Sequence, residues 1–235
     1  MKERNIKRFE QRQLELDKSF ESHCAMCDQR YTNRENILLP PKELYAMAKE
    51  LNITPKEVFE KYCEAYIGFE TKIPVVRIKM VGSDRKCPLL KDRKCLVHNA
   101  KPTICALFPV ECFLLTEKLE SQLVNKKTGY FFEHPDCSDD PETQIVCAWM
   151  NVFGIPFEGP FFVVWQDALL ELSTEIQRIE KSIDYETMCD IWKMVFSSIY
   201  LDYDMEQDFM EQFTEKQDTM ISLLKTLPLS KGGKK

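Results

Sequence analysis

Three cysteines lie close together in one polar segment of the chain. They are Cys87, Cys95 and Cys105, in the stretch CPLLKDRKCLVHNAKPTIC, and they follow the spacing Cys-x7-Cys-x9-Cys. An earlier Cys-x2-Cys pair, Cys24 and Cys27, lies about 60 residues upstream. Thiolate sulfur is the ligand type that selects zinc, Cu(I) or iron–sulfur clusters. The chain is therefore expected to fold around a metal site whose ligands come from separate loops.

The residues around these cysteines suit metal ligands better than core side chains. Pro88 and Pro102 stiffen the segment, and several basic residues can offset the charge of thiolates; these are Lys86, Lys91, Arg93, Lys94 and Lys101. The alternative is that a free cysteine is simply a small buried apolar residue. That interpretation fits the cysteines in apolar stretches, which are Cys63, Cys112, Cys147 and Cys189. Among these, Cys147 is the one to promote if a ligand is missing.

The segment from Cys87 to Pro109 resembles the signature of the YkgJ family of cysteine-cluster proteins, which are described as zinc- or iron-chelating domains. The pattern of that family runs CPFL, then Cys-x-Ile-Tyr or Cys-x-Ile-His, then RPxxCRxFP. Upstream, the Cys24 and Cys27 pair and the stretch ILLPPKEL (37–44) follow the same course. The resemblance covers roughly residues 20–140. It implies a metal-binding domain held together by cysteines.

The chain also departs from the family pattern. Arg30 and Tyr31 stand where the family has two adjacent cysteines, and Ala106 replaces the arginine of the last motif. Cys137 is the counterpart of a further family cysteine, without its glycine. The resemblance thus implies six candidate ligands: Cys24, Cys27, Cys87, Cys95, Cys105 and Cys137. Six thiolates can complete one four-coordinate site, but two all-cysteine sites would take eight.

Two histidines offer mixed cysteine and histidine alternatives. His98 follows Cys95 at Cys-x2-His spacing, which can chelate a metal. The relatives alternate between tyrosine and histidine at that position, which favours packing or a second-shell hydrogen bond. His134 lies three residues before Cys137. Ligation by either histidine stays open at this point.

Composition narrows the class of protein. The 235 residues are 44% hydrophobic, which is enough for a core without disulfides. A net charge of −6 disfavours direct binding to nucleic acid, since such binders carry a basic surplus. The first 20 residues lack the apolar region of a secretory signal, and no apolar run is long enough to span a membrane. These features predict a cytoplasmic protein with reduced thiols and no membrane partner.

Hydrophobic periodicity predicts a mainly α fold with a small β element, an irregular α+β architecture. Helices are expected at 3–20, 41–51, 55–66, 103–108, 141–152, 162–182, 185–201 and 204–226. The helix expected at 55–66 has a clear start, because Thr54, Pro55 and Glu57 form a capping-box sequence. A strand is expected at 75–80, and a hairpin of 112–117 and 128–132 is expected to turn at NKKTG.

The expected organisation has four parts: an N-terminal helical arm at 1–20, a cysteine-cluster metal-binding domain at 21–152, a helical C-terminal region at 153–228 and a disordered tail at 229–235. The expected function is binding of zinc or an iron–sulfur cluster at one thiolate-ligated site, either structural or redox-active. One alternative is an enzyme, methyltransferase- or maturase-like, with a supporting cluster. The other is an adaptor that binds another protein through its acidic helical tail. No catalytic residue is assigned.

Overall fold

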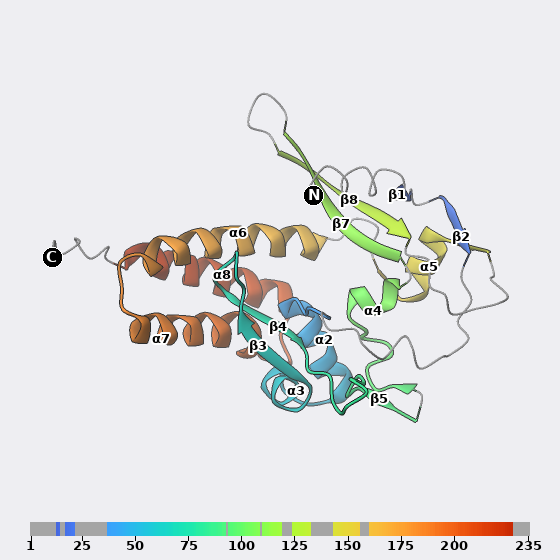
Figure 1. Cartoon of the computed structure of the whole chain (residues 1–235), viewed down its shortest axis with the longest axis horizontal. Coiled ribbons are helices and arrows are strands. Elements are labelled where there is room, and N and C mark those ends of the chain that lie inside the picture. Colours follow the sequence, from blue (N-terminus) through green and yellow to red (C-terminus); the bar gives the residue numbers. More distant parts are fainter. Residues whose placement is uncertain are drawn as a thin grey trace. The chain divides into compact units, whose positions relative to one another are not determined.

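The computed structural model in Figure 1 describes residues 13–14, 17–21, 37–92, 94–108, 110–118, 124–132, 143–155 and 160–227. Within these ranges the chain is mainly helical, with one three-stranded sheet and three two-stranded sheets. The predicted fold class, mainly α with a small β element, is confirmed. The chain forms two compact units. The first unit comprises 1–33 and 101–163, and the second unit comprises 34–100 and 164–235.

The division into units differs from the boundary expected after residue 152. The C-terminal helices do not form a region of their own, because they pack against the helices that precede the cysteine segment. The hydroxyl of Tyr45, for example, donates a hydrogen bond of 2.9 Å to the backbone carbonyl of Gln207. Distant parts of the sequence thus build one core in the second unit.

Two short helices open the described part of the second unit. Helix α2 (Pro41–Leu51) ends at Asn52, whose left-handed φ of 53° stops the helix. Helix α3 (Pro55–Tyr62) begins with the predicted capping box. The Thr54 hydroxyl accepts from the Glu57 backbone N–H at 3.2 Å, and the Thr54 N–H donates to the Glu57 carboxylate at 2.8 Å. The expected start of both helices is confirmed.

Helix α3 ends earlier than the expected residue 66, because the chain turns into a strand. Strand β3 (Cys63–Ile67) pairs antiparallel with β4 (Pro74–Ile78), and Cys63 lies opposite Ile78. The Gly68 N–H donates to the Ile73 carbonyl at 2.9 Å and closes the turn between them. The pairing with β4 satisfies the backbone hydrogen bonds of residues 63–67. The helical spacing of apolar residues, which predicted a helix up to residue 66, gives no sign of this pairing.

The C-terminal half supplies most of the core. It contains α6 (Pro160–Glu180), α7 (Tyr185–Phe196), the π-helical turn η2 (Ser197–Leu201) and α8 (Phe209–Thr226). Their fully buried side chains include Ala168, Leu172, Ile176, Phe213 and Leu224. Helix α8 starts five residues later than expected, because the Asp208 carboxylate caps it by accepting from the N–H groups of Met210 and Glu211.

The first unit is built on strands. In its sheet the strand order is β1 (Gln13–Leu14), β8 (Val124–Phe132), β7 (Val110–Lys118), and β2 (Ser19–Glu21) pairs separately with β9 (Thr143–Ile145). Helices α4 (Thr103–Leu107) and α5 (Val146–Val152) complete it. A core cluster gathers Phe20, Leu107, Val110, Val146 and Met150. The Trp149 indole N–H donates to the Leu107 carbonyl at 3.1 Å.

Three expectations in the first unit are corrected. The helical arm at 1–20 is wrong where the structure describes it, because residues 13–14 and 19–21 are strands that pair with β8 and β9. The predicted hairpin exists, but the NKKTG stretch lies inside β8 and pairs with β7. The helix expected at 141–152 begins at Val146, since residues 143–145 form β9. In each case a non-local strand pairing overrides a local preference.

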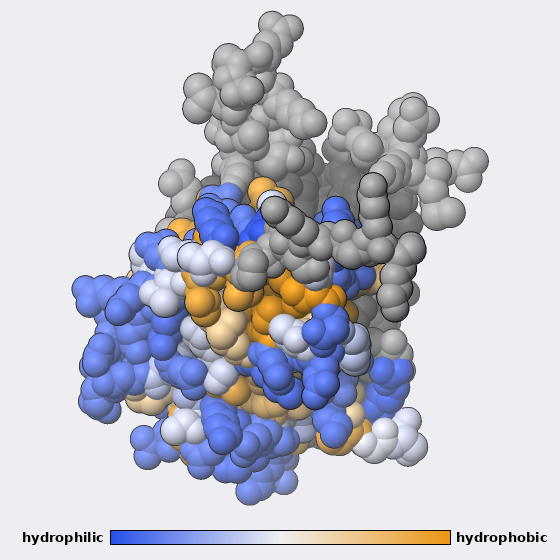
Figure 2. All heavy atoms as spheres, turned by 90° about the vertical axis from the view of Figure 1, so that its left-hand side faces the viewer, coloured by the Kyte–Doolittle hydropathy of each residue, from blue (hydrophilic) through white to orange (hydrophobic). Residues whose placement is uncertain are grey.

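The described surface is largely polar on one face. In the view of Figure 2, hydrophilic residues cover most of the described surface and surround a smaller hydrophobic area. Across the described ranges, no helix combines the length and the apolar character needed to cross a membrane.

Candidate metal site at the β5–β6 hairpin

Two of the predicted ligands flank a small hairpin in the second unit. Strands β5 (Leu90–Lys91) and β6 (Lys94–Cys95) pair antiparallel, with Leu90 opposite Cys95. The Leu90 N–H donates to the Cys87 carbonyl at 3.1 Å, and the Leu96 N–H donates to the Leu89 carbonyl at 2.8 Å. The hairpin folds the chain back so that Cys87 and Cys95 come together.

The hairpin is anchored by apolar side chains on both flanks. Leu89 and Val97 are fully buried, whereas Lys91 and Lys94 at the tip are exposed. At the turn, Asp92 has a left-handed φ of 49°, a conformation that aspartate tolerates better than most residues. Cys95 lies between the exposed tip and the Val97 anchor, Cys87 lies two residues before the Leu89 anchor, and both cysteines are half-buried. They are thus accessible to an incoming ion without leaving the fold.

The sulfur of Cys87 is partly buried and accepts hydrogen bonds from the backbone, and these two features act on its pKa in opposite directions. Burial raises the pKa of the Cys87 thiol, but the backbone N–H groups of Leu89 and Leu90 donate hydrogen bonds to the sulfur and oppose that rise. The nearby Cys95 thiol raises the pKa of Cys87 further, which places the two sulfurs within electrostatic reach of each other. Backbone N–H groups aimed at sulfur favour the charged form, the form that binds a metal.

Cys63 is a thiol that the sequence assigned to the core. It is 6% exposed, as that interpretation requires. Burial raises the pKa of its thiol to about 12, and the neighbouring Cys87 adds to this rise. In the second unit, the Cys87 thiol therefore interacts electrostatically with two other thiols, those of Cys63 and Cys95. No local sequence pattern separates Cys63 from the helix stripe, because residues 63–67 become a strand only through their pairing with β4.

The other predicted ligands are less fully placed. Cys105 lies in α4 of the first unit, half-buried, and its backbone N–H donates to the Pro102 carbonyl at 2.8 Å. Cys24, Cys27, Cys137 and the alternative ligand His134 lie outside the described residues. His98 is exposed in the turn after β6. Cys147 is half-buried in α5.

The described thiols do not by themselves form a closed site. Within the part of the chain that the structure describes, no group of three or more His, Cys, Asp or Glu residues is arranged to hold a metal ion. The donor set at the hairpin fits a thiophilic metal in chemical type, because it consists of sulfur alone. It needs further donors, or a rearrangement of the side chains present, to complete a coordination shell.

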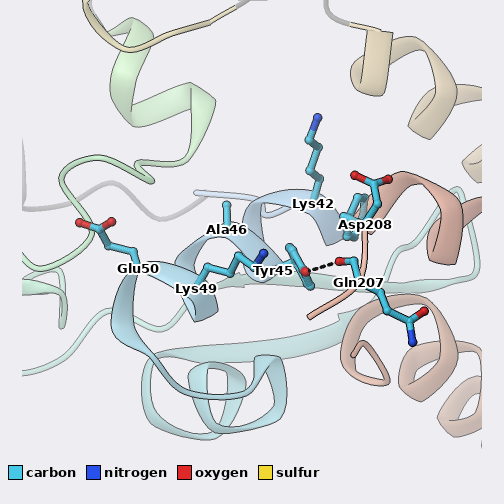
Figure 3. Close-up of a pocket in the computed structure, with 8 residues that line it drawn as sticks. Lys42, Tyr45, Ala46, Lys49, Glu50, Gln207 and Asp208 are labelled. Carbon is cyan, nitrogen blue, oxygen red and sulfur yellow. Dashed lines mark hydrogen bonds between the residues drawn. The ribbon is translucent and has the colours of Figure 1, made fainter. Parts of the chain in front are cut away.

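A second feature of the same unit is a shallow hollow between α2 and the start of α8. Its cavity volume is about 440 Å³, and Figure 3 shows the residues that line it, among them Tyr45, Lys49, Gln207 and Asp208. Several of its polar groups already interact within the fold. Lys49 lies over the Tyr45 ring at 5.4 Å, and Asp208 caps α8. The hollow is best described as the junction where the two segments pack.

The acidic stretch that follows η2 is also largely engaged within the fold. The Asp204 carboxylate accepts hydrogen bonds from the Glu206 backbone N–H and from the Gln207 side chain, both within 2.9 Å. The Asp202 carboxylate accepts from the Ser197 hydroxyl at 3.0 Å. These carboxylates shape the connection into α8, so their sequence density does not by itself indicate an acidic docking surface.

No protein-family profile matches this chain, and searches of the curated proteins and of the solved structures likewise found no match. The resemblance to the YkgJ family therefore rests on the quoted residues alone.

Proposed function

We propose that this protein binds a thiophilic metal, zinc or an iron–sulfur cluster, through cysteines from separate loops, with Cys87 and Cys95 as the central pair. The arrangement that supports this best is the hairpin at 90–95. It brings two thiols within electrostatic reach of each other and directs two backbone N–H groups at the sulfur of Cys87. A cysteine that served only as a small apolar residue would not need this arrangement.

The remaining donors in this proposal come from the cysteines that the sequence singled out. These are Cys24, Cys27, Cys105 and Cys137. Zinc would form a closed tetrahedral site that stabilises the loops carrying its ligands. An iron–sulfur cluster with the same thiolates would add one-electron chemistry, either electron transfer or redox sensing. The all-sulfur donor set supports both.

Metal analysis and absorption spectroscopy test the proposal directly. The full chain is purified without oxygen, and its zinc, iron and acid-labile sulfide are measured. About one zinc per chain in colourless protein indicates the closed site. Brown protein that dithionite bleaches indicates a cluster. Metal-free protein that takes up neither cobalt nor iron with sulfide, yet stays folded, rejects metal binding.

Point variants test whether the metal binds to the cysteines of the hairpin. Cys87→Ser and Cys95→Ser should each weaken metal binding by more than the roughly 10–100-fold expected for second-shell changes. Cys189→Ser is the matched control, since Cys189 is also a half-buried cysteine of the second unit but lies in α7. Equal metal content in all three variants would place the metal elsewhere.

The adaptor and enzyme alternatives stand as second proposals with less support. The internal hydrogen bonds of Asp202 and Asp204 weaken the case for a free acidic surface. A supporting cluster in an enzyme predicts the same metal content as the main proposal, so only an activity would separate the two.

A further inference from the structure

Strand β3 has an open edge. Its neighbour β4 is bonded on both sides, to β3 and to residues 37–39. On the second side the Leu39 N–H donates to the Val76 carbonyl at 2.9 Å, and the Ile78 N–H donates to the Ile37 carbonyl at 3.0 Å. Within the described part of the chain, β3 pairs with β4 alone (Figure 1). An open strand edge is a surface that another strand can extend.

The register of the β3–β4 hairpin determines which backbone groups face this edge. The Gly68 N–H donates to the Ile73 carbonyl at 2.9 Å, so these two residues form a hydrogen-bonded pair. Along an antiparallel ladder such pairs alternate with pairs that are not hydrogen bonded. The N–H and C=O groups of Ala65 and Ile67 therefore point away from β4, toward the open edge. No described residue forms a hydrogen bond with these groups.

The side chains along this edge are exposed and largely apolar. Tyr66 is 41% exposed and Ile67 is 37% exposed, and Phe69 in the turn that follows is 87% exposed. The charge of Glu64 is balanced within the chain, because its carboxylate forms an ion pair with Arg77 of β4 at 2.7 Å. Strand β3 contains neither lysine nor proline, the residues that commonly protect an exposed edge. The edge is thus suited to pairing with a further strand.

We propose that β3 pairs antiparallel with β3 of a second copy of this chain, with Tyr66 on the two-fold axis. In this register Ala65 of each copy lies opposite Ile67 of the other, so the outward N–H and C=O groups of both residues are all bonded. A two-fold interface requires such a self-complementary pattern. Moving the axis to Ala65 would place Ile67 opposite Cys63, whose N–H already donates to the Phe59 carbonyl.

The side chains also suit pairing between two copies. On one face of the new ladder, Ile67 lies beside the small side chain of Ala65 of the other copy. On the opposite face the two Tyr66 side chains meet in a pair that is not hydrogen bonded, where opposite Cα atoms lie about 4.5 Å apart. Aromatic pairs of this kind stabilise sheets. Glu64 remains with Arg77 of its own chain, so the interface gains no uncompensated charge.

Sedimentation velocity of the full chain tests the pairing. The chain is kept with a thiol reductant and a chelator, which exclude dimers linked by disulfides or by metal. A contact this small is expected to be weak, so the concentration is varied from about 10 µM to 1 mM. Reversible dimerisation is expected within this range. A chain that stays monomeric up to about 1 mM overturns the proposal, also when an added extended peptide binds at the β3 edge.

Two variants locate the contact. Ala65→Pro removes an N–H group that points away from β4, so it should abolish dimerisation and leave the β3–β4 pairing intact. Ile67→Lys should weaken dimerisation by at least about tenfold, because it places a charge on the edge. Leu223→Lys is the matched control, since Leu223 in α8 is 41% exposed and the change in charge is the same. Dimerisation that both edge variants retain overturns the proposal.

Amide hydrogen exchange of the unmodified chain keeps the test decisive if a variant fails to fold. The amides of Ala65 and Ile67 exchange only from the open edge. They should therefore exchange about tenfold more slowly when about nine-tenths of the chains are dimers than in dilute solution. The amides of Glu64 and Tyr66, which face β4, should exchange at the same rate at both concentrations. Dimers in which the Ala65 and Ile67 amides gain no protection would place the interface elsewhere and overturn the proposal.

Discussion

The two hairpins of the second unit are stabilised in different ways. The β3–β4 hairpin has five residue pairs, and β4 alternates buried and half-buried side chains. On its other side β4 also pairs with residues 37–39, since the Leu39 N–H donates to the Val76 carbonyl at 2.9 Å. The β5–β6 hairpin has two pairs and an exposed, charged tip. A hairpin that short is marginal without further support.

This difference suggests separate roles for the two hairpins. The β3–β4 hairpin is part of the hydrophobic core, and its strand pairing fixes the backbone of Cys63 opposite Ile78. The β5–β6 hairpin depends on two apolar anchors, and in the proposal on a metal as well. The first should therefore respond to changes in packing, and the second to metal.

The largest expected effect comes from opening a cavity beneath the longer hairpin. Ile78 is 2% exposed on β4. Ile78→Ala should lower the free energy of unfolding by about 2–5 kcal/mol, because it removes buried methyl groups and leaves a void. Urea unfolding of the metal-free chain measures this. The control is Ile67→Ala on β3, whose side chain is 37% exposed and should change stability by no more than about 0.5 kcal/mol. Equal losses for both would contradict the one-sided burial of this hairpin.

Metal removal should act mainly on the shorter hairpin. With metal at about 1,000 times its dissociation constant, binding stabilises the structure that carries the ligands by up to about 4 kcal/mol. Chelation should therefore speed hydrogen exchange at the amides of Leu90 and Leu96, which are bonded within the hairpin. The amides of Gly68 and Lys72 in the β3–β4 turn serve as the internal reference. Exchange that accelerates equally in both hairpins would argue against a metal local to β5–β6.

The sequence predicted those features of the second unit that depend only on residues close together in the chain. The capping box at Thr54 and Glu57 marked the start of α3 correctly, because it needs only residues three apart. The end of α3 was missed, because Cys63, with Phe59 four residues earlier, continues a helical stripe, and only pairing with β4 makes residues 63–67 a strand. The burial of Cys63 could be read from its apolar neighbours. Its electrostatic interaction with Cys87 depends on strand pairings that no local pattern encodes.

A smaller effect should follow from loosening the attachment of the longer hairpin to α7. The Trp192 indole N–H donates to the Lys72 carbonyl in the β3–β4 turn at 2.8 Å. Trp192→Phe keeps an aromatic ring but removes this bond, which should cost about 0.5–1.5 kcal/mol. Urea unfolding measures the free energy of unfolding of this variant. Leu170→Ala, at an exposed position of α6, is the control. If the two variants are equally stable, the indole bond contributes nothing to holding the turn.

The smallest effect concerns the start of α7, the helix that carries Trp192. The Asp184 carboxylate accepts from the Thr187 N–H at 2.9 Å, and this bond, with the Thr187 hydroxyl, lowers the pKa of Asp184 below its ordinary value. Because the folded-state pKa is the lower one, the stabilisation is fully present above the unfolded-state pKa. It is lost as the pH falls through the folded-state pKa. Asp184→Asn keeps a capping oxygen but does not titrate. Thermal unfolding followed from neutral to acidic pH should therefore show a slightly shallower acid loss in the variant, whereas identical profiles would mean that the charge on Asp184 does not stabilise the helix.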